Sequence, residues 1–220
     1  MRIGVIGAGN IGGNAARRLA GAGHEVLLSF SRDPTSLEVL ARELGERART
    51  GAPAEAVAFG EAVIFAVPWG AIPEALEQAG DLTGRIVVDT TNQFGPGPKP
   101  AEGETAAAFN AARMPGASYT KSFNTLTAAF QAAAAERTGP DRVVQWLCGV
   151  EEGAKQVVSG LITDAGYVPV DLGGVETCAV MEAPRRPGAV YGEEYRLADA
   201  QAVAAAVREG RPIPPTPSYA

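Results

Sequence analysis

Short apolar runs alternate along the chain with longer segments in which apolar residues recur every three or four positions. The run 62–67 is apolar throughout, which is typical of a strand buried on both faces of a parallel sheet. Strands are expected at 3–6, 25–30, 62–67, 85–89, 119–123, 143–148 and 167–172. Helices are expected at 11–22, 35–48, 53–59, 71–79, 102–113, 125–136, 151–165 and 197–208. This alternation predicts an α/β fold with a doubly wound parallel sheet.

A glycine-rich turn joins the first predicted strand to the first predicted helix. It has the spacing Gly-x-Gly-x-x-Gly at Gly7, Gly9 and Gly12, with Asn10 and Ile11 inside the turn. In dinucleotide-binding Rossmann folds these glycines form the tight turn, admit a pyrophosphate and let the helix pack close to the strand. The helix N-terminus then directs free N–H groups at the phosphates. We therefore expect this turn to bind a dinucleotide.

The end of the second predicted strand carries a hydroxyl and a guanidinium where an NAD-binding chain would carry an acid. NAD enzymes place Asp or Glu about 20 residues past the glycines, to bind the ribose hydroxyls. Here Ser31 and Arg32 occupy that position, and Ser36 follows in the next helix. These groups suit a 2′-phosphate and favour NADP(H) as the cofactor. If the alignment is shifted by one or two positions, Asp33 takes the place of the acid in NAD-binding chains, which leaves NAD as the alternative.

Parallel α/β sheets bind ligands at the carboxyl ends of their strands, so residues there are the site candidates. The further candidates for cofactor contact are Val67, Pro68, Trp69, Thr91, Asn92 and Asn124. Hydride transfer between flat heterocycles needs little from side chains beyond stacking the rings and excluding water. We expect Trp69 to shape the nicotinamide pocket and Lys121 to stabilise an anionic acceptor ring, which makes these two the catalytic candidates.

Each of these candidates also has a structural alternative. Trp69 suits a core position that caps the sheet equally well. A strand lysine such as Lys121 is more often a solvated edge residue. Thr91 and Asn92 can cap the following loop, and Asn124 can N-cap the helix expected at 125–136.

Composition narrows the partners and the compartment. The chain has 220 residues and a formal net charge of −6, with no cluster of Lys or Arg, which disfavours nucleic acid and anionic membranes. No apolar run approaches the ~20 residues of a membrane span. The first strand starts at residue 2 or 3, which leaves no room for a signal peptide and predicts a cytoplasmic location.

Cysteine and histidine are scarce. Cys148 and Cys178 are the two cysteines, each in an apolar stretch, and we expect buried reduced thiols rather than a disulfide or metal ligands. His24, the one histidine, lies between a helix and a strand and is expected to help close the helix end. No metal site is predicted.

The predicted domain organisation is a dinucleotide-binding domain over 1–172 and a C-terminal extension over 173–220. The extension contains a Pro/Arg/Gly segment at 184–188, one clear helix and the Pro-rich segment 211–217. Such a segment forms core poorly, so it is expected to be disordered or to lie as an arm on a partner subunit of a homodimer.

As a set, the motifs resemble the NADPH-dependent F420 reductase family and, similarly, the reductase domain of the STEAP metalloreductases. The motifs are the glycine turn, Ser31-Arg32, residues 66–69, 89–92 and 121–125. The resemblance covers about 1–172 and implies hydride exchange between NADP(H) and a deazaflavin, coenzyme F420, in a dimeric protein. It also implies that Ser31 and Arg32 bind NADP and that Pro68-Trp69 lies beside the nicotinamide. Phe30 stands where the family often has Gly, and Ser36 stands where some members have a basic residue, which removes one phosphate contact. Segments 90–92, 121–124 and 181–188 differ from those of the F420 reductases and leave the acceptor open.

Three functional classes compete. The first is an NADPH-dependent reductase of a small acceptor, either a deazaflavin or a flavin or ferric compound. The second, an imine or β-hydroxyacid dehydrogenase, needs a long helical domain, whereas only about 48 residues follow Leu172. The third is a non-catalytic NADP-binding redox sensor. The first class agrees best with the motifs.

Overall fold

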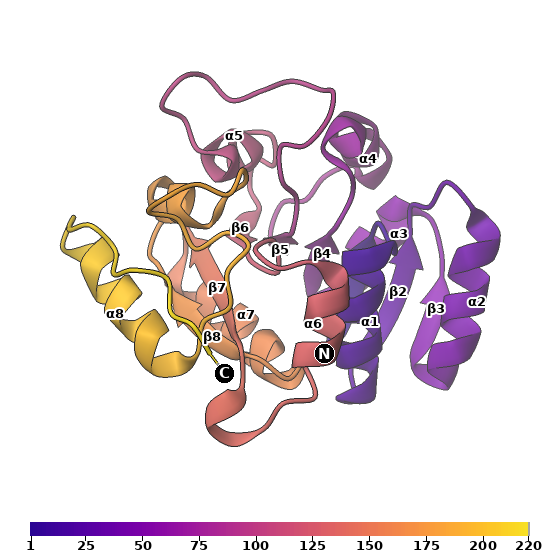
Figure 1. The fold of residues 1–220 in the computed structure, drawn as a ribbon. Helices are drawn as coiled ribbons and strands as arrows, with labels where there is room; N and C mark the ends of the chain where they lie inside the picture. Colours follow the sequence, from indigo (N-terminus) through magenta and orange to yellow (C-terminus); the bar gives the residue numbers. More distant parts are fainter. Residues whose placement is uncertain (220) are drawn as a thin grey trace.

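The computed structural model describes residues 1–219 and contains an eight-stranded sheet in the order β3-β2-β1-β4-β5-β6-β7-β8 (Figure 1). The strands are β1 (Arg2–Ile6), β2 (Glu25–Ser29), β3 (Ala48–Thr50), β4 (Ala62–Phe65), β5 (Ile86–Asp89), β6 (Ser118–Lys121), β7 (Val144–Gly149) and β8 (Val168–Asp171). Neighbouring strands are parallel except for β6 and β7, which pair antiparallel. The predicted doubly wound α/β fold is confirmed.

Helices cover both faces of the sheet. They are α1 (Asn10–Gly21), α2 (Pro34–Leu44), α3 (Pro53–Phe59), α4 (Ile72–Ala79), α5 (Ala106–Ala112), α6 (Ala128–Ala134), α7 (Glu152–Asp164) and α8 (Leu197–Arg208). Buried residues of α1, α2, α6 and α7 belong to one apolar cluster. Those of α3, α4, α5 and α8 belong to a second cluster. The continuous apolar strands predicted from the sequence are therefore buried between two helical layers.

Three helices are shorter than predicted, and one strand was missed. The helix expected at 35–48 ends at Leu44, because Gly45 follows at φ +73°, a conformation that favours glycine. The next residues then form β3, a three-residue edge strand on β2. The helices expected at 102–113 and 125–136 start late, because Thr105 and Thr127 cap α5 and α6 with their hydroxyls.

The C-terminal extension is tied into the sheet and into α5. The Tyr195 backbone carbonyl accepts a hydrogen bond from the Val144 N–H of β7 at 2.8 Å. The Glu182 carboxylate, only 4% exposed, accepts from the N–H groups of Ala106 and Ala107 at 2.9 and 2.7 Å. These are the first N–H groups of α5, which have no partner inside the helix. The extension therefore completes an element that begins 76 residues earlier in the chain.

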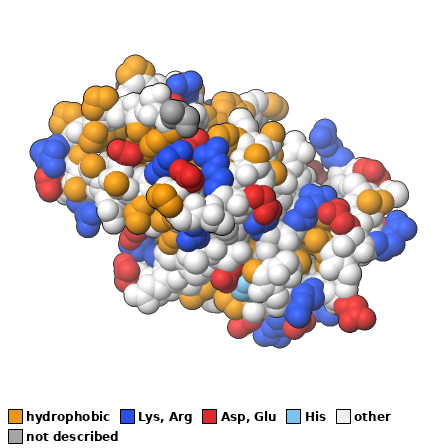
Figure 2. Space-filling model, turned by 60° about the horizontal axis from the view of Figure 1, so that its bottom comes forward, with side chains coloured by type: hydrophobic (Ala, Val, Ile, Leu, Met, Phe, Trp, Pro, Cys, Tyr) orange, Lys and Arg blue, Asp and Glu red, His pale blue; other side chains and the backbone are white. Residues whose placement is uncertain are grey.

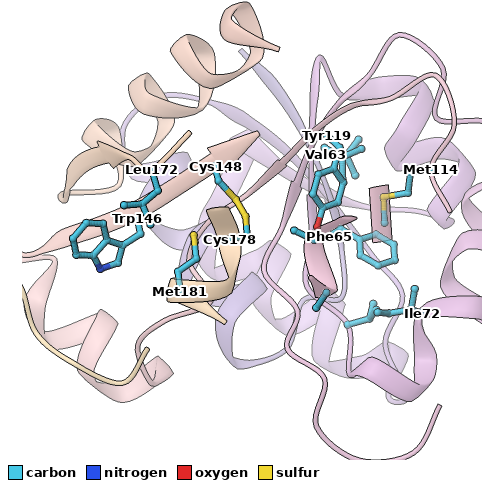
Figure 3. Close-up of a cluster of buried hydrophobic side chains, with 14 of the residues drawn as sticks. Val63, Phe65, Ile72, Met114, Tyr119, Trp146, Cys148, Leu172, Cys178 and Met181 are labelled. Atoms are coloured by element: carbon cyan, nitrogen blue, oxygen red, sulfur yellow. A yellow bond between two sulfur atoms is a disulfide. The ribbon is translucent and has the colours of Figure 1, made fainter. Parts of the chain in front are cut away.

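The two cysteines correct a prediction. Cys148, on β7, and Cys178, in a 3₁₀ helix over Val175–Met181, are joined in a disulfide and are fully buried (Figure 3). The sequence predicts reduced thiols, because it has only two cysteines, each in an apolar stretch, and favours a cytoplasmic location. The fold brings their Cα atoms to 6.2 Å, within the usual range for a disulfide.

The described part of the Pro-rich tail lies against its own chain. The Tyr219 ring sits over the Arg196 guanidinium at 4.3 Å, and its hydroxyl donates to Asp199 at 2.7 Å and accepts from the Arg196 N–H at 2.9 Å. Ile213 packs against the apolar cluster that contains α8. Ile213 and Tyr219 therefore contact their own chain, and both the contact of the tail with a partner subunit and the homodimer stay predictions.

The surface is mixed in charge on the face that Figure 2 shows, where acidic and basic side chains alternate and neither sign forms a broad patch. Within residues 1–219, none of the helices combines the length and the apolar character required to cross a bilayer.

Candidate functional site

Two glycines of the turn are required by the close approach of backbone segments. Gly7 has φ +95°, and a Cβ there would lie 2.5 Å from the Ala66 carbonyl oxygen that follows β4. A Cβ on Gly12 would lie 2.1 Å from the Gly7 oxygen. Side chains at either position would push α1 away from the sheet. The sequence prediction for these two residues agrees with their geometry.

Gly9 differs from the other two, because a Cβ there would meet nothing within 4 Å. It is exposed at the N-cap of α1, where no side chain caps the helix and no acidic residue lies in the first turn. The first N–H groups of a helix have no intrahelical partner and attract anions. The space in front of Gly9, beside Asn10 and Ile11, therefore fits a pyrophosphate.

The segment after β2 forms a compact hydroxyl cluster. The Ser31 and Ser36 hydroxyl oxygens lie 3.0 Å apart, and Ser36 donates to the Asp33 carbonyl at 2.6 Å. The Asp33 side chain caps α2 by accepting from the Thr35 N–H at 3.0 Å. That capping role accounts for Asp33 without a ribose contact and weakens the NAD alternative.

A groove of about 590 Å³ joins these parts of the site. Its lining residues are Ala8, Gly9, Asn10, Asn14, Arg17, Ser31, Ser36, Leu40, Ala128, Ala129 and Ala132. Arg32 is exposed beside Ser31, and no hydrogen bond or ion pair engages its guanidinium within residues 1–219. The sequence analysis missed Asn14 and Arg17. Their positions four and seven residues after Asn10 place them on the same face of α1, which is the signal that would have found them.

Trp69 is a core residue. It follows Val67, which is buried, and Pro68, which is exposed, and is itself only 1% exposed. Its indole N–H donates to the Pro98 carbonyl at 2.7 Å, and its ring stacks on Phe109 at 6.1 Å. Of the two alternatives for Trp69, the structure shows the core position, and its role in shaping the nicotinamide pocket stays a prediction. The ring holds the loop at 95–100, and Val67 and Pro68 are left at the edge of β4.

A buried polar network lies at the carboxyl ends of β5 and β6. Tyr119 and the Asn110 amide donate to Asp89 Oδ2 at 2.5 and 2.7 Å. The Thr91 N–H donates to Asp89 Oδ1 at 2.7 Å. Lys121 Nζ donates to the Thr91 carbonyl at 2.7 Å and lies 3.5 Å from Asp89 Oδ2. Thr91 is thus fixed through both of its backbone polar groups.

Charge and burial set the protonation of this network. Burial alone would raise the pKa of the Asp89 carboxyl, but the Lys121 ammonium and three hydrogen bonds bring the pKa below its ordinary value. Burial and the neighbouring Asp89 charge raise the pKa of Tyr119 well above its ordinary value, so the phenol keeps its proton. Lys121 has no exposed surface. It is therefore neither the solvated edge residue nor the acceptor-facing lysine that we considered, and it acts on the site only through Thr91.

Asn92 and Asn124 link the two strand ends to the extension. The Asn92 amide donates to the Asn124 carbonyl at 2.8 Å, and the Asn124 amide donates to the Met181 carbonyl at 2.7 Å. Asn124 does not cap a helix, because Thr127 caps α6. Within residues 1–219, the buried Asn124 Oδ1 and Thr125 Oγ1 atoms have no hydrogen-bond partner. Both atoms belong to the loop that leaves β6.

Comparison with known proteins relates the N-terminal part of the chain to one family of reductases. Residues 2–93, which include the glycine turn and Ser31-Arg32, match the family model described as NADP oxidoreductase, coenzyme F420-dependent. The candidate F420-dependent NADP-reductase of Arthrobacter sp. FB24 is 28% identical, with a TM-score of 0.68 over 81% of this chain and 87% of that one. Over residues 2–93 the chain is therefore similar to the coenzyme F420-dependent NADP oxidoreductases.

The chain is also similar to two further proteins. A hypothetical protein of Sinorhizobium meliloti, SMa0349, is 30% identical, with a TM-score of 0.78 over 90% of this chain and 96% of that one. Metalloreductase STEAP3 of Rattus norvegicus is 29% identical over 188 residues, which are 83% of this chain. The match spans only 36% of the STEAP3 chain.

Proposed function

We propose that this protein is an NADPH-dependent reductase that transfers a hydride to a deazaflavin, coenzyme F420, or to a similar flat acceptor. The observation that carries the proposal is the groove in which the open backbone of Gly9 faces the same space as Ser31 and Ser36. The family description and the name of the Arthrobacter relative support the choice of F420.

Different residues of the site bind different parts of the cofactor. NADPH, when bound, supplies the hydride. The first turn of α1 holds the pyrophosphate, and Ser31, Ser36 and Arg32 hold the 2′-phosphate. Val67 and Pro68 provide an apolar edge for the nicotinamide and exclude water from it. No side chain has to take up or release a proton for hydride transfer to proceed.

Cofactor choice is tested with Arg32→Ala. Removing a charge-assisted contact worth about 1.5–3 kcal/mol should weaken NADPH binding roughly ten- to a hundredfold and leave NADH binding nearly unchanged. Arg42→Ala is the matched control, because Arg42 is also exposed on the α2 side but bonds only the Glu38 carbonyl. Equal losses for NADPH and NADH would contradict the assignment. Fluorescence titration of both cofactors gives the comparison.

The acceptor is tested by NADPH oxidation with oxidised F420, with FMN and a ferric chelate assayed in parallel. Rapid turnover with F420 alone supports the proposal. Turnover with FMN or ferric chelate favours the second candidate, a flavin or ferric reductase, which the similarity to STEAP3 suggests. Tight NADPH binding with no turnover for any acceptor would leave a redox sensor as the function.

A further inference from the structure

A large aromatic ring is exposed at the edge of the sheet where the site lies. Phe94 follows β5 and is 56% exposed, and the other large hydrophobic residues exposed within 1–219 are aliphatic. Its nearest aromatic neighbour is Tyr191 of the extension, with ring centres 6.2 Å apart and planes inclined at 57°. Two distant parts of the chain therefore contribute one aromatic surface.

Hydrogen bonds hold both rings on fixed backbone. The Phe94 N–H donates to the Asn92 carbonyl at 2.7 Å. Lys99 Nζ bridges the carbonyls on either side of Phe94, at 2.8 Å to Gln93 and 3.0 Å to Gly95. An exposed phenylalanine costs hydrophobic free energy, and these three bonds order the backbone on which the ring is exposed. The loop therefore holds the Phe94 ring on the surface.

The Tyr191 side of the surface is bonded to the loop that follows β6. The Gly192 N–H donates to the Thr125 carbonyl at 2.8 Å. Asn124 Oδ1 and Thr125 Oγ1, the buried atoms without partners, belong to this same loop. The backbone that carries Tyr191 is thus bonded to the loop between β6 and α6, whose residues Asn124 and Thr125 are buried.

The topology puts this surface next to the place where hydride leaves the cofactor. A dinucleotide spans the switch point of the sheet. Ser31 and Arg32, which are expected to bind the adenosine half, follow β2 on one side of the glycine turn. The nicotinamide half is then expected on the other side of the turn, at β4. The next strand is β5, which leads into Phe94. An acceptor that contacts the nicotinamide from the far side would meet the strand ends of β5 and β6.

We propose that Phe94 and Tyr191 form an aromatic platform that binds the fused heteroaromatic ring of a flavin or deazaflavin acceptor. This inference rests on the proposed reductase function and names the residues that select its acceptor. Flat rings pack on aromatic side chains in offset or edge-to-face arrangements. The tilted pair offers one ring for each arrangement.

The experiment measures acceptor binding apart from turnover. Quenching of FMN and F420 fluorescence is titrated with the protein saturated with NADP⁺, and KM values for acceptor and NADPH are measured in parallel. Phe94→Ala and Tyr191→Ala should each raise the acceptor Kd and KM roughly three- to tenfold, with the KM for NADPH unchanged within about twofold. Tyr191→Phe should keep wild-type values, because the ring remains.

Val150→Ala is the matched control, since Val150 is 63% exposed and its N–H bonds the Tyr119 carbonyl at the opposite edge of the sheet. Wild-type turnover with unchanged acceptor binding in both alanine variants overturns the platform and leaves the reductase function standing. Failure of the wild-type protein to reduce or bind any flat acceptor overturns both. A lower solution mass for the Phe94→Ala variant would show that the rings contact a second copy of the chain, and would also overturn the platform.

Discussion

Replacing Lys121 by methionine leaves the Asp89 carboxylate buried without its cation. The two side chains have no exposed surface and are 3.5 Å apart, and Lys121 also donates to the Thr91 carbonyl. Removing one member of a buried pair costs about 3–5 kcal/mol, because the remaining charge stays desolvated. For a chain of this size each kcal/mol lowers Tm by about 2–4 °C, so we expect a decrease of about 6–20 °C.

The pH dependence identifies the cause. In the wild type the pKa of Asp89 lies below its unfolded value, so its stabilisation is present above the unfolded pKa and is lost as the pH falls through the folded pKa. Without Lys121 we expect burial to raise the folded pKa above the unfolded value. Folding then takes up a proton at neutral pH, and the destabilisation grows as the pH rises. The decrease in Tm should therefore be smaller at pH 4.5 than at pH 7.5.

The assay is thermal unfolding followed by circular dichroism at both pH values. Lys155→Met is the control, because its partners Asp171 and Glu152 are exposed and such pairs contribute at most about 1 kcal/mol. The double variant Asp89→Asn/Lys121→Met should recover much of the loss, since it removes the uncompensated charge. A Tm for Lys121→Met within about 2 °C of the wild type, or a larger decrease at pH 4.5, would refute the reasoning.

Three further predictions address the glycine turn, the tail and the disulfide. Gly9→Ala should have the Tm of the wild type yet bind NADPH at least tenfold more weakly, whereas Gly12→Ala should have a Tm several degrees lower. Thermal unfolding and fluorescence titration with NADPH distinguish the two variants. Equal decreases in Tm would contradict the open space in front of Gly9. Tyr219→Ala should lower Tm by a few degrees through lost contacts, with solution mass unchanged by light scattering. Thiol titration of protein unfolded without reductant should find Cys148 and Cys178 unreactive; two free thiols would contradict the disulfide.

The sequence was sufficient for the parts of the site that depend on local spacing. The glycine turn and Ser31-Arg32 follow from the positions of residues relative to a strand end, and one groove is lined by Gly9, Asn10 and Ser31. The sequence could not show the surroundings of Trp69. Its position after β4 is the same for a ring that faces a cofactor and for one held by Pro98 and Phe109.

Lys121 illustrates a second limit. Asp89 and Lys121 lie in two different predicted strands, and only the register of β5 on β6, which places them opposite each other, makes them partners. Strand register depends on the assembled sheet rather than on local pattern. The same holds for the cysteines, whose contact depends on how the extension returns to β7. Edge strand β3, with three residues, is too short to carry a hydrophobic period.

The Glu182 cap on α5 has a consequence for the order in which the chain folds. Ala106 and Ala107 leave the ribosome before Glu182, whose carboxylate binds their N–H groups and lies 76 and 75 residues later in the chain. The N-terminal strands can pair during synthesis, but α5 must wait until nearly the whole protein has emerged. Nascent chains arrested before residue 182 should therefore leave this helix open to proteases and chaperones, while the glycine turn is already assembled.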